Sequence, residues 1–268
     1  MKKLLAALLT VGLILSFAIS AFAVVPGDGE WDPDTEPSIN LENRLSQKQV
    51  PLPKETLEII AAKEAALYNS PAKAYPTSVR IGPMVQYPQE AGNYCGPSAV
   101  KTVLNNEWVT ISQKTLAGSS YLKTDANNGT PWYLANGLTL NQYPTATTLN
   151  ALGNFYWNPY PFRNLGAAPL KADLKPRMVD TLSQYHGVLA DGASKASSSH
   201  ASHLPGYPNK DVAHWLAVDG YANSGETIWI VDPASGSSHV SWSSGIPQYY
   251  SITLDKFTAF VAPRGIIW

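Results

Sequence analysis

The sequence predicts an α+β fold in which a helical N-terminal part packs on an antiparallel β-sheet. Apolar residues first recur at helical spacing, between Cys95 and about residue 185, with Gly, Asn and Pro between the segments. The expected helices are 96–106, 144–152 and about 174–185. From residue 186 onward the pattern changes to short apolar runs bounded by turn residues, which is typical of strands. The expected strands are 187–191, 213–221, 226–232, about 247–253 and 258–263. Helices first and antiparallel strands second indicate an α+β architecture.

Residues 1–23 have the pattern of a secretory signal peptide. Two lysines precede an apolar run from Leu4 to about Ile19, and a small-x-small cleavage pattern ends at Ala23. The alternative is a membrane anchor helix. However, the run is short for a span and is followed by polar chain rich in Pro and Gly. We therefore expect cleavage after Ala23, a secreted, extracellular protein and no stable membrane insertion.

Residues 24–78 are predicted to be a linker or pro-segment with one helix, followed by a single domain over residues 79–268. The first part, up to about residue 50, is rich in Asp, Glu, Pro and Gly without periodicity, which is typical of disordered chain. From Lys54 to Tyr68 apolar residues fall near helical spacing. This helix belongs either to an inhibitory pro-segment or to an N-terminal arm that packs on the domain.

The charge balance gives no sign of a nucleic-acid partner. The 268 residues include 19 Lys and Arg against 20 Asp and Glu, and no basic tract is present. The remaining candidates are a peptide, a protein or a cell-wall peptide, bound by a monomer.

The chain has one cysteine, Cys95. A secreted protein usually uses cysteines in pairs, as disulfides, and here no intrachain disulfide is possible. Without context, a buried inert thiol is the expected interpretation. Pro97 stands where a first-turn proline belongs, and Val100, Val103 and Leu104 continue at helical spacing. Cys95 therefore lies at a helix start, where the positive end of the helix dipole favours a nucleophilic thiolate. The neighbouring Gly96 would let the backbone approach a substrate closely.

Two of the expected strands, 213–221 and 226–232, form a hairpin around the turn residues 222–225. If the loop has three residues, 222–224 or 223–225, alternation places His214 and Asp232 on one face at the open end of the hairpin. A register shifted by one would separate them. The pair could be structural, or it could be the base and orienter of a nucleophilic triad.

Several motifs, taken in order, resemble the family of bacteriocin leader-processing (double-glycine) cysteine peptidases. The closer likeness is to that family's stand-alone secreted relatives, within the papain-like superfamily. The matching pieces are Gln89 six residues before Cys95, the string Tyr94-Cys95-Gly96-Pro97-Ser98, His203 to Pro208, His214 opening a strand that ends Gly220-Tyr221, and Asp232-Pro233. The resemblance covers about residues 80–265.

The resemblance implies a papain-like fold and a role for each matching residue. Cys95 would attack the scissile carbonyl, and His214 would hold its proton and later protonate the leaving amine. Asp232 would orient the imidazole. The Gln89 side-chain amide and the Cys95 backbone N–H would stabilise the oxyanion. No cofactor and no metal are implied. Because the chain has no membrane-spanning or ATP-binding region of the transporter-linked kind, only the reaction type carries over.

The sequence-based interpretation is a secreted cysteine peptidase that hydrolyses peptide bonds through a thioester acyl-enzyme. A cell-wall amidase or a transpeptidase on the same scaffold remains open, because all three reactions share the acyl-enzyme. A non-catalytic surface-binding protein is the other alternative. Asp219 and Gln86 are second choices for the orienter and the oxyanion donor. A metal site at His200 and His203 lacks supporting ligands in a Ser-rich loop.

Overall fold

The computed structural model describes residues 54–69, 73–82, 84–134, 142–161 and 169–268. The predicted signal peptide and the predicted linker up to about residue 50 lie outside the described residues. Within the described ranges, no helix combines the length and the apolar character that a membrane span needs.

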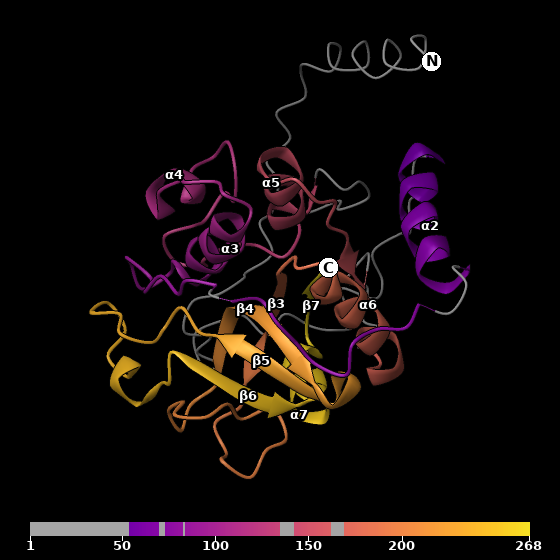
Figure 1. The fold of residues 1–268 in the computed structure, drawn as a ribbon. Helices are drawn as coiled ribbons and strands as arrows, with labels where there is room; N and C mark the ends of the chain where they lie inside the picture. The colour runs from indigo at the N-terminus through magenta and orange to yellow at the C-terminus, as the bar shows by residue number, and fades with distance from the viewer. Residues whose placement is uncertain (1–53, 70–72, 83, 135–141, 162–168) are drawn as a thin grey trace, which may run out of the picture.

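The architecture is α+β, as predicted, with one antiparallel sheet between two groups of helices (Figure 1). The strand order is β2-β7-β3-β4-β5-β6, and β1 pairs with the far end of β4. The described strands are β1 (Val79–Arg80), β2 (Pro159–Tyr160), β3 (Val188–Ser194), β4 (Val212–Ala222), β5 (Thr227–Val231), β6 (Tyr249–Thr253) and β7 (Gly265–Ile267). The described helices are α2 (Lys54–Asn69), α3 (Cys95–Asn106), α4 (Gln113–Ala117), α5 (Pro144–Leu152), α6 (Lys171–Ser183) and α7 (Leu254–Val261).

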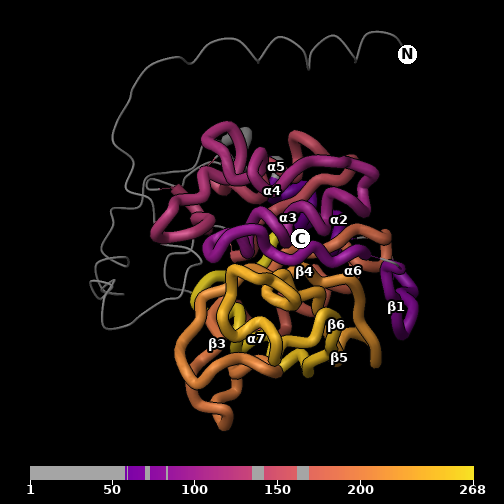
Figure 2. Tube along the Cα trace, turned by 90° about the vertical axis from the view of Figure 1, so that its left-hand side faces the viewer, coloured from indigo at the N-terminus to yellow at the C-terminus, as the bar shows by residue number. Residues whose placement is uncertain are grey.

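Strand β4 separates two hydrophobic cores because its side chains alternate between the faces of the sheet. Leu216 and Val218 belong to the core that also contains residues of α6 and α7. Trp215 and Ala217 belong to the core that contains residues of α3 and α5. In Figure 2, α3, α4 and α5 lie together on one side of the strands, so the helical part forms a layer of its own.

The four helices predicted from apolar spacing are confirmed, and one predicted strand is wrong. Residues 258–263 were expected as a strand because Phe and Val are strand formers. Instead, most of this segment belongs to α7, which Thr253 caps by accepting a hydrogen bond from the Lys256 N–H. Leu254, Phe257 and Phe260 recur every third residue and are all buried, so helical burial prevails over strand propensity.

The β4–β5 hairpin reaches the expected register by a route that differs from the prediction. The loop has four residues rather than three, because Ala222 pairs with Thr227. This shifts the register by one near the turn. A bulge between Val218 and Gly220 shifts it back, so that Ala217 pairs with Val231. The open end therefore has the alternation that places His214 and Asp232 on one face.

The helix α2 packs on the edge of the domain. Lys63 Nζ donates hydrogen bonds to the backbone oxygens of Tyr156, at 2.7 Å, and Trp268, at 2.6 Å. Arg177 on α6 forms a two-pronged ion pair with Glu64, at 3.1 and 2.6 Å. Through these contacts α2 docks on α6 and on Trp268, which follows β7.

Candidate active site

Cys95 is the first residue of α3 and is 2% exposed. The helix is described throughout, and its first turn contains no acidic residue and no side-chain cap. The positive end of the helix dipole is thus not neutralised by a carboxylate next to the sulfur, and such a position favours a thiolate. The predicted placement of Cys95 at a helix start is confirmed.

Gly96 makes room for a contact within the chain. A Cβ at this position would lie 2.3 Å from Thr130 Oγ1, which is far closer than real Cβ contacts. Thr130 is held in turn by a hydrogen bond from Trp215 Nε1 to its carbonyl, at 3.1 Å. The lack of a side chain at Gly96 thus lets α3 pack closely on the segment between α4 and α5 that contains Thr130.

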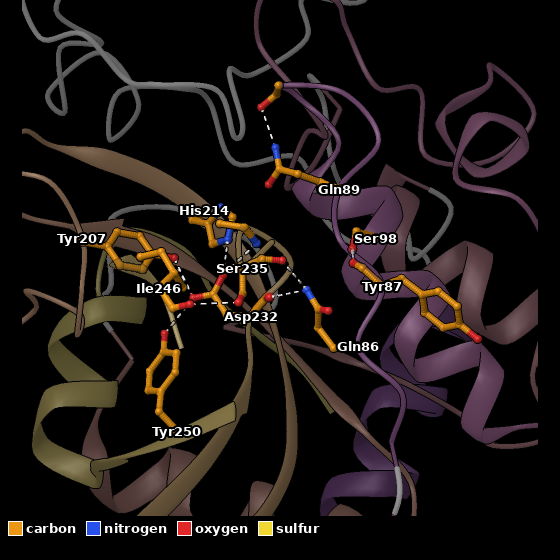
Figure 3. A network of polar contacts seen from close by, with 12 residues as sticks. Gln86, Tyr87, Gln89, Ser98, Tyr207, His214, Asp232, Ser235, Ile246 and Tyr250 are labelled. Atoms are coloured by element: carbon orange, nitrogen blue, oxygen red, sulfur yellow. Dashed lines mark hydrogen bonds and ion pairs between the residues drawn. The ribbon is translucent and has the colours of Figure 1, made fainter. Parts of the chain in front are cut away.

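His214 and Asp232 form a buried hydrogen-bonded pair (Figure 3). The His214 ring lies near the start of β4 and Asp232 directly follows β5, so the hairpin brings them together. His214 Nε2 lies 3.1 Å from Asp232 Oδ1, and the two side chains are 3% and 0% exposed. With Nε2 directed at the carboxylate, Nδ1 is the ring nitrogen that remains for another partner.

The Asp232 carboxylate accepts four hydrogen bonds. Oδ1 accepts from His214 Nε2 and from the Ala234 N–H, at 3.1 and 2.9 Å. Oδ2 accepts from the hydroxyls of Tyr207 and Tyr250, at 3.0 and 2.9 Å. A buried carboxylate with four donors is stabilised in its ionised, acceptor-only form.

A cavity of about 550 Å³ is lined by both Cys95 and His214. We call it the Cys95 cavity. Its lining residues are Gln89, Gly92, Asn93, Cys95, Ala126, Asn127, Val212, Ala213, His214, His239, Val240, Ser241 and Trp242. None of these is Asp, Glu, Lys or Arg. A second cavity of about 320 Å³ shares Gln89 and His239 with it, so the hollow continues past the site.

Gln89 lines the Cys95 cavity, but its amide nitrogen already has two acceptors. Nε2 donates to the carbonyls of Ala91 and Gly92, at 2.9 and 2.8 Å. Its Oε1 is buried with no hydrogen-bond partner among the described residues. An amide group has two N–H donors, so Gln89 must release one carbonyl before it can donate to a substrate.

The second-choice residues have other roles in the structure. Gln86 Nε2 donates to the carbonyls of Asp232 and Ser235, both at 2.9 Å, and so supports the backbone beside the site. Asp219 pairs with Arg80 at 2.9 Å, and Arg80 stacks over Trp229 on the sheet face opposite Ile230. Neither residue lines the Cys95 cavity.

Three other histidines contact groups within the chain. His203 Nδ1 contacts the carbonyl of Lys195, and His200 Nδ1 contacts Ser202 Oγ. His186 pairs with Glu107 at 2.7 Å. Among the residues that the structure describes, no group of three or more His, Cys, Asp or Glu could hold a metal ion. His239 is exposed and lines both cavities.

Sequence reasoning missed three aromatic residues next to the His214–Asp232 pair. Tyr207 and Tyr250 donate to Asp232, and Trp242 packs edge-on to His214 with ring centroids 6.3 Å apart. Tyr207 did lie in the matching string from His203 to Pro208, so its signal was present without an assigned role. Tyr250 carried no signal beyond strand alternation.

The chain was compared with family models, with curated sequences and with solved structures. The family model described as Peptidase C39 like family matches residues 81–253. Among solved structures, a protein described as a C39-like peptidase from Bacillus anthracis has a TM-score of 0.44 and 11% identity, covering 72% of this chain and 97% of its own. The ragweed pollen cysteine protease Amb a 11, in its proform, has a TM-score of 0.44 and 12% identity, covering 74% and 66%. Xylellain, a cysteine protease from Xylella fastidiosa, has a TM-score of 0.37 and 10% identity, covering 95% and 98%. No curated protein sequence matches the chain significantly.

Proposed function

The chain belongs to the peptidase C39-like family, and on that premise we propose that it is a secreted cysteine peptidase whose nucleophile is Cys95. The family agrees with the resemblance that the motifs predicted, and it supports cysteine peptidase activity. One observation carries the assignment to these residues: Cys95 shares a cavity with His214, whose Nε2 lies 3.1 Å from the buried Asp232 carboxylate.

In the proposed first step, Cys95 Sγ attacks the carbonyl carbon of the scissile peptide bond as a thiolate. His214 holds the thiol proton on Nδ1 and donates it to the leaving nitrogen when the C–N bond breaks. The products are a free amine and a thioester between Sγ and the acyl group. Asp232 keeps Nε2 protonated and the ring oriented, and its charge stabilises the imidazolium.

In the second step, water takes the place of the leaving amine. His214 Nδ1 accepts a proton from the water, whose oxygen bonds to the thioester carbon. The C–S bond then breaks, releasing a carboxylic acid and restoring the thiolate and imidazolium. No group beyond these side chains is needed for the balance of atoms and charge.

The oxyanion formed in both steps needs hydrogen-bond donors. We assign this role to the Cys95 backbone N–H and to Gln89, whose side chain lines the same cavity. Gln89 would exchange its bond to the Ala91 or Gly92 carbonyl for one to the oxyanion. A lost donor of this kind typically reduces the rate by a factor of about 10² to 10³.

The lining of the Cys95 cavity favours a neutral substrate segment at the scissile bond. Asn93 and Asn127 offer amide groups, while Val212, Val240 and Trp242 offer apolar contact. A buried charged side chain would find no counter-ion among these lining residues. We infer that the physiological substrate is a peptide or protein with uncharged residues beside the cleaved bond.

Cleavage of a peptide library by the protein that begins at Val24, compared with its Cys95→Ala variant, tests the assignment. Mass spectrometry should detect products with new amino and carboxyl ends for the parent protein and none for the variant. The same measurement on peptidoglycan, and with an added amine acceptor, separates hydrolysis from cell-wall amidase or transpeptidase activity. Covalent labelling by an epoxysuccinyl inhibitor should occur at Cys95.

Two results would overturn the proposal. Cleavage retained by Cys95→Ala would show that another nucleophile acts. A folded, reduced parent protein that is not labelled and cleaves no peptide would instead favour a binding protein that keeps the fold. Secretion is tested separately, by N-terminal sequencing of the exported protein, which should begin at Val24.

A further inference from the structure

Two tyrosine hydroxyls from separate parts of the chain meet at one oxygen of Asp232 (Figure 3). Tyr207 comes from the connection between β3 and β4, and Tyr250 comes from β6. Both hydroxyls donate to Oδ2, while His214 and the Ala234 N–H take Oδ1. The carboxylate therefore uses one oxygen for the histidine and the other for the tyrosines.

We propose that Tyr207 and Tyr250 are positioning residues that hold the Asp232 carboxylate ionised and aimed at His214 Nε2. This inference rests on the proposed function, because it assigns a device to the same site. It goes beyond the triad, because neither tyrosine touches the substrate or the reacting atoms.

The geometry explains why two donors on Oδ2 matter for the bond at Oδ1. A carboxylate can rotate about its Cβ–Cγ bond, and any rotation short of a half turn moves the oxygen that faces the histidine out of line with Nε2. Two hydroxyls at 3.0 and 2.9 Å on Oδ2, together with the Ala234 N–H on Oδ1, leave one orientation in which every donor is satisfied. With Nε2 held by Oδ1, Nδ1 stays directed away from Asp232, where the thiol proton must be held.

The Asp232 carboxylate has a histidine, and no lysine or arginine among the described residues, as its ion-pair partner. His214 from β4 is the titratable cation at the carboxylate, and Cys95 from α3 lies near enough to Tyr207 to influence it electrostatically. In the described part of the chain, no lysine or arginine forms an ion pair with Asp232. The hydroxyls of Tyr207 and Tyr250 are therefore the remaining side-chain donors that stabilise the anion in a fully buried position.

Both tyrosines are suited to act as lasting donors. Burial, reinforced by the negative charge of Asp232, raises the pKa of Tyr207 and of Tyr250 well above the usual range. With the pKa raised in this way, both hydroxyls keep their protons at neutral and mildly alkaline pH, so each one donates to the carboxylate. Trp242, which lines the Cys95 cavity, packs against Tyr207 with the ring centroids 5.0 Å apart and the ring planes tilted by 44°.

The test measures the pH dependence of Cys95 alkylation by iodoacetamide in the parent protein and in Tyr207→Phe and Tyr250→Phe. Because Cys95 is the only cysteine, the reaction reports on this sulfur alone. Removing one hydroxyl leaves the buried carboxylate with one donor fewer on Oδ2, so its negative charge and its aim at His214 are less well held, and the charged form of His214 is less well stabilised. We expect the acid side of the rate profile to move to higher pH by about one unit in each variant. At a pH on that side, the alkylation rate should therefore be roughly tenfold lower than in the parent protein.

Tyr221→Phe is the matched control. Tyr221 is a fully buried tyrosine of β4 whose hydroxyl bonds Ser183 Oγ and the Pro76 carbonyl, and it does not contact Asp232. Its profile should match that of the parent protein. Equal profiles for all three variants, with folding confirmed by circular dichroism, would overturn the inference. So would a shift in Tyr221→Phe as large as in the other two.

A second comparison covers the possibility that one variant does not fold. In an Asp232→Asn background, either tyrosine substitution should leave the alkylation profile where Asp232→Asn alone puts it, because the carboxylate through which it acts is gone. A further shift in that background would contradict the mechanism. Alkylation needs no substrate, so it is measured independently of peptide cleavage. The tyrosine variants can leave the alkylation profile unchanged in a protein that cleaves peptides, and they can shift it in a protein that cleaves none.

Discussion

The hairpin β4–β5 carries two buried aspartates, and they differ in how completely their charge is satisfied. Asp232, at the open end, accepts four hydrogen bonds. Asp219, at the bulge near the turn, accepts one side-chain bond, from Arg80, and its Oδ1 has no partner among the described residues. Burial raises the pKa of Asp219 to about 6, against the opposing charge and hydrogen bond of Arg80.

The difference teaches what qualifies a carboxylate to orient a histidine. Burial alone favours the neutral acid, as Asp219 illustrates. A carboxylate that must stay charged next to an imidazole needs donors on both oxygens, and these come to Asp232 from the loop before β4, from the turn after β5 and from β6. The sequence spacing predicted that both residues lie on the hairpin, but it could not predict how many hydrogen-bond donors each carboxylate has.

The largest expected contrast is in catalysis. Asp232→Asn removes the charge that stabilises the imidazolium and should lower kcat/KM for a cleaved peptide by about 10³-fold or more. Asp219→Asn, on the opposite face of the sheet, should stay within about threefold of the parent protein, since Asp219 does not line the Cys95 cavity. Steady-state kinetics of both variants measures the contrast. Similar losses of kcat/KM for the two variants would contradict the claim that Asp232, and not Asp219, supports catalysis.

The second contrast concerns the loss of partners. Arg80→Met leaves the Asp219 carboxylate buried without its cation, and it should lower the free energy of unfolding at pH 7 by about 2 kcal/mol. Adding Asp219→Asn should recover most of this loss, because a neutral amide needs no counter-ion. Urea denaturation of the two single variants and the double variant gives the coupling. An additive double variant would mean that the pair does not interact energetically.

The third contrast is the pH dependence of stability. The pKa of Asp219 is about 6 in the folded state and near 3.8 when unfolded, so the folded state binds more protons between these values. Stability due to protonated Asp219 is therefore full below about pH 4 and is lost as the pH rises through 6. Relative to Asp219→Asn, the parent protein should lose about 2 kcal/mol between pH 4 and pH 7. A constant difference across this range would place the titration elsewhere.

The smallest expected effect on activity comes from removing the arm that carries α2. Lys63 and Glu64 bind the domain at Trp268 and Arg177, none of which lines the Cys95 cavity. A chain that begins at Lys73 should keep kcat/KM within about twofold and melt a few degrees lower. A large gain in activity would instead identify α2 as part of an inhibitory pro-segment.

A chain that begins near Ile81 should behave differently from one that begins at Lys73. It lacks Arg80 as well as α2, and Asp219 then loses its cation. We expect this longer truncation to cost more stability than the shorter one at both pH values, because it also removes β1 and the Tyr75–Asp180 hydrogen bond. The extra cost should be larger at pH 7 than at pH 4, where Asp219 is protonated. Thermal melts of both chains at the two pH values measure the difference.

The sequence by itself determined the local parts of the site. Helical spacing after Pro97 placed Cys95 at the start of α3, and strand alternation placed His214 and Asp232 on one face of a hairpin. Both are short-range consequences of backbone geometry, since side-chain direction follows the period of the element. The one wrong strand, 258–263, failed where burial of Phe257 and Phe260 against the sheet outweighed local strand propensity.

Only the tertiary structure decided how the site is supported. Three features show this: the bulge that restores the register at Val218, the two carbonyls that hold Gln89, and the meeting of Tyr207 with Tyr250 at Asp232. None of them follows from a regular spacing of residues along the sequence. Such contacts arise when packed layers bring distant residues within hydrogen-bond reach. A buried charge then selects the arrangement in which its donors are present, and that selection is a property of the folded chain.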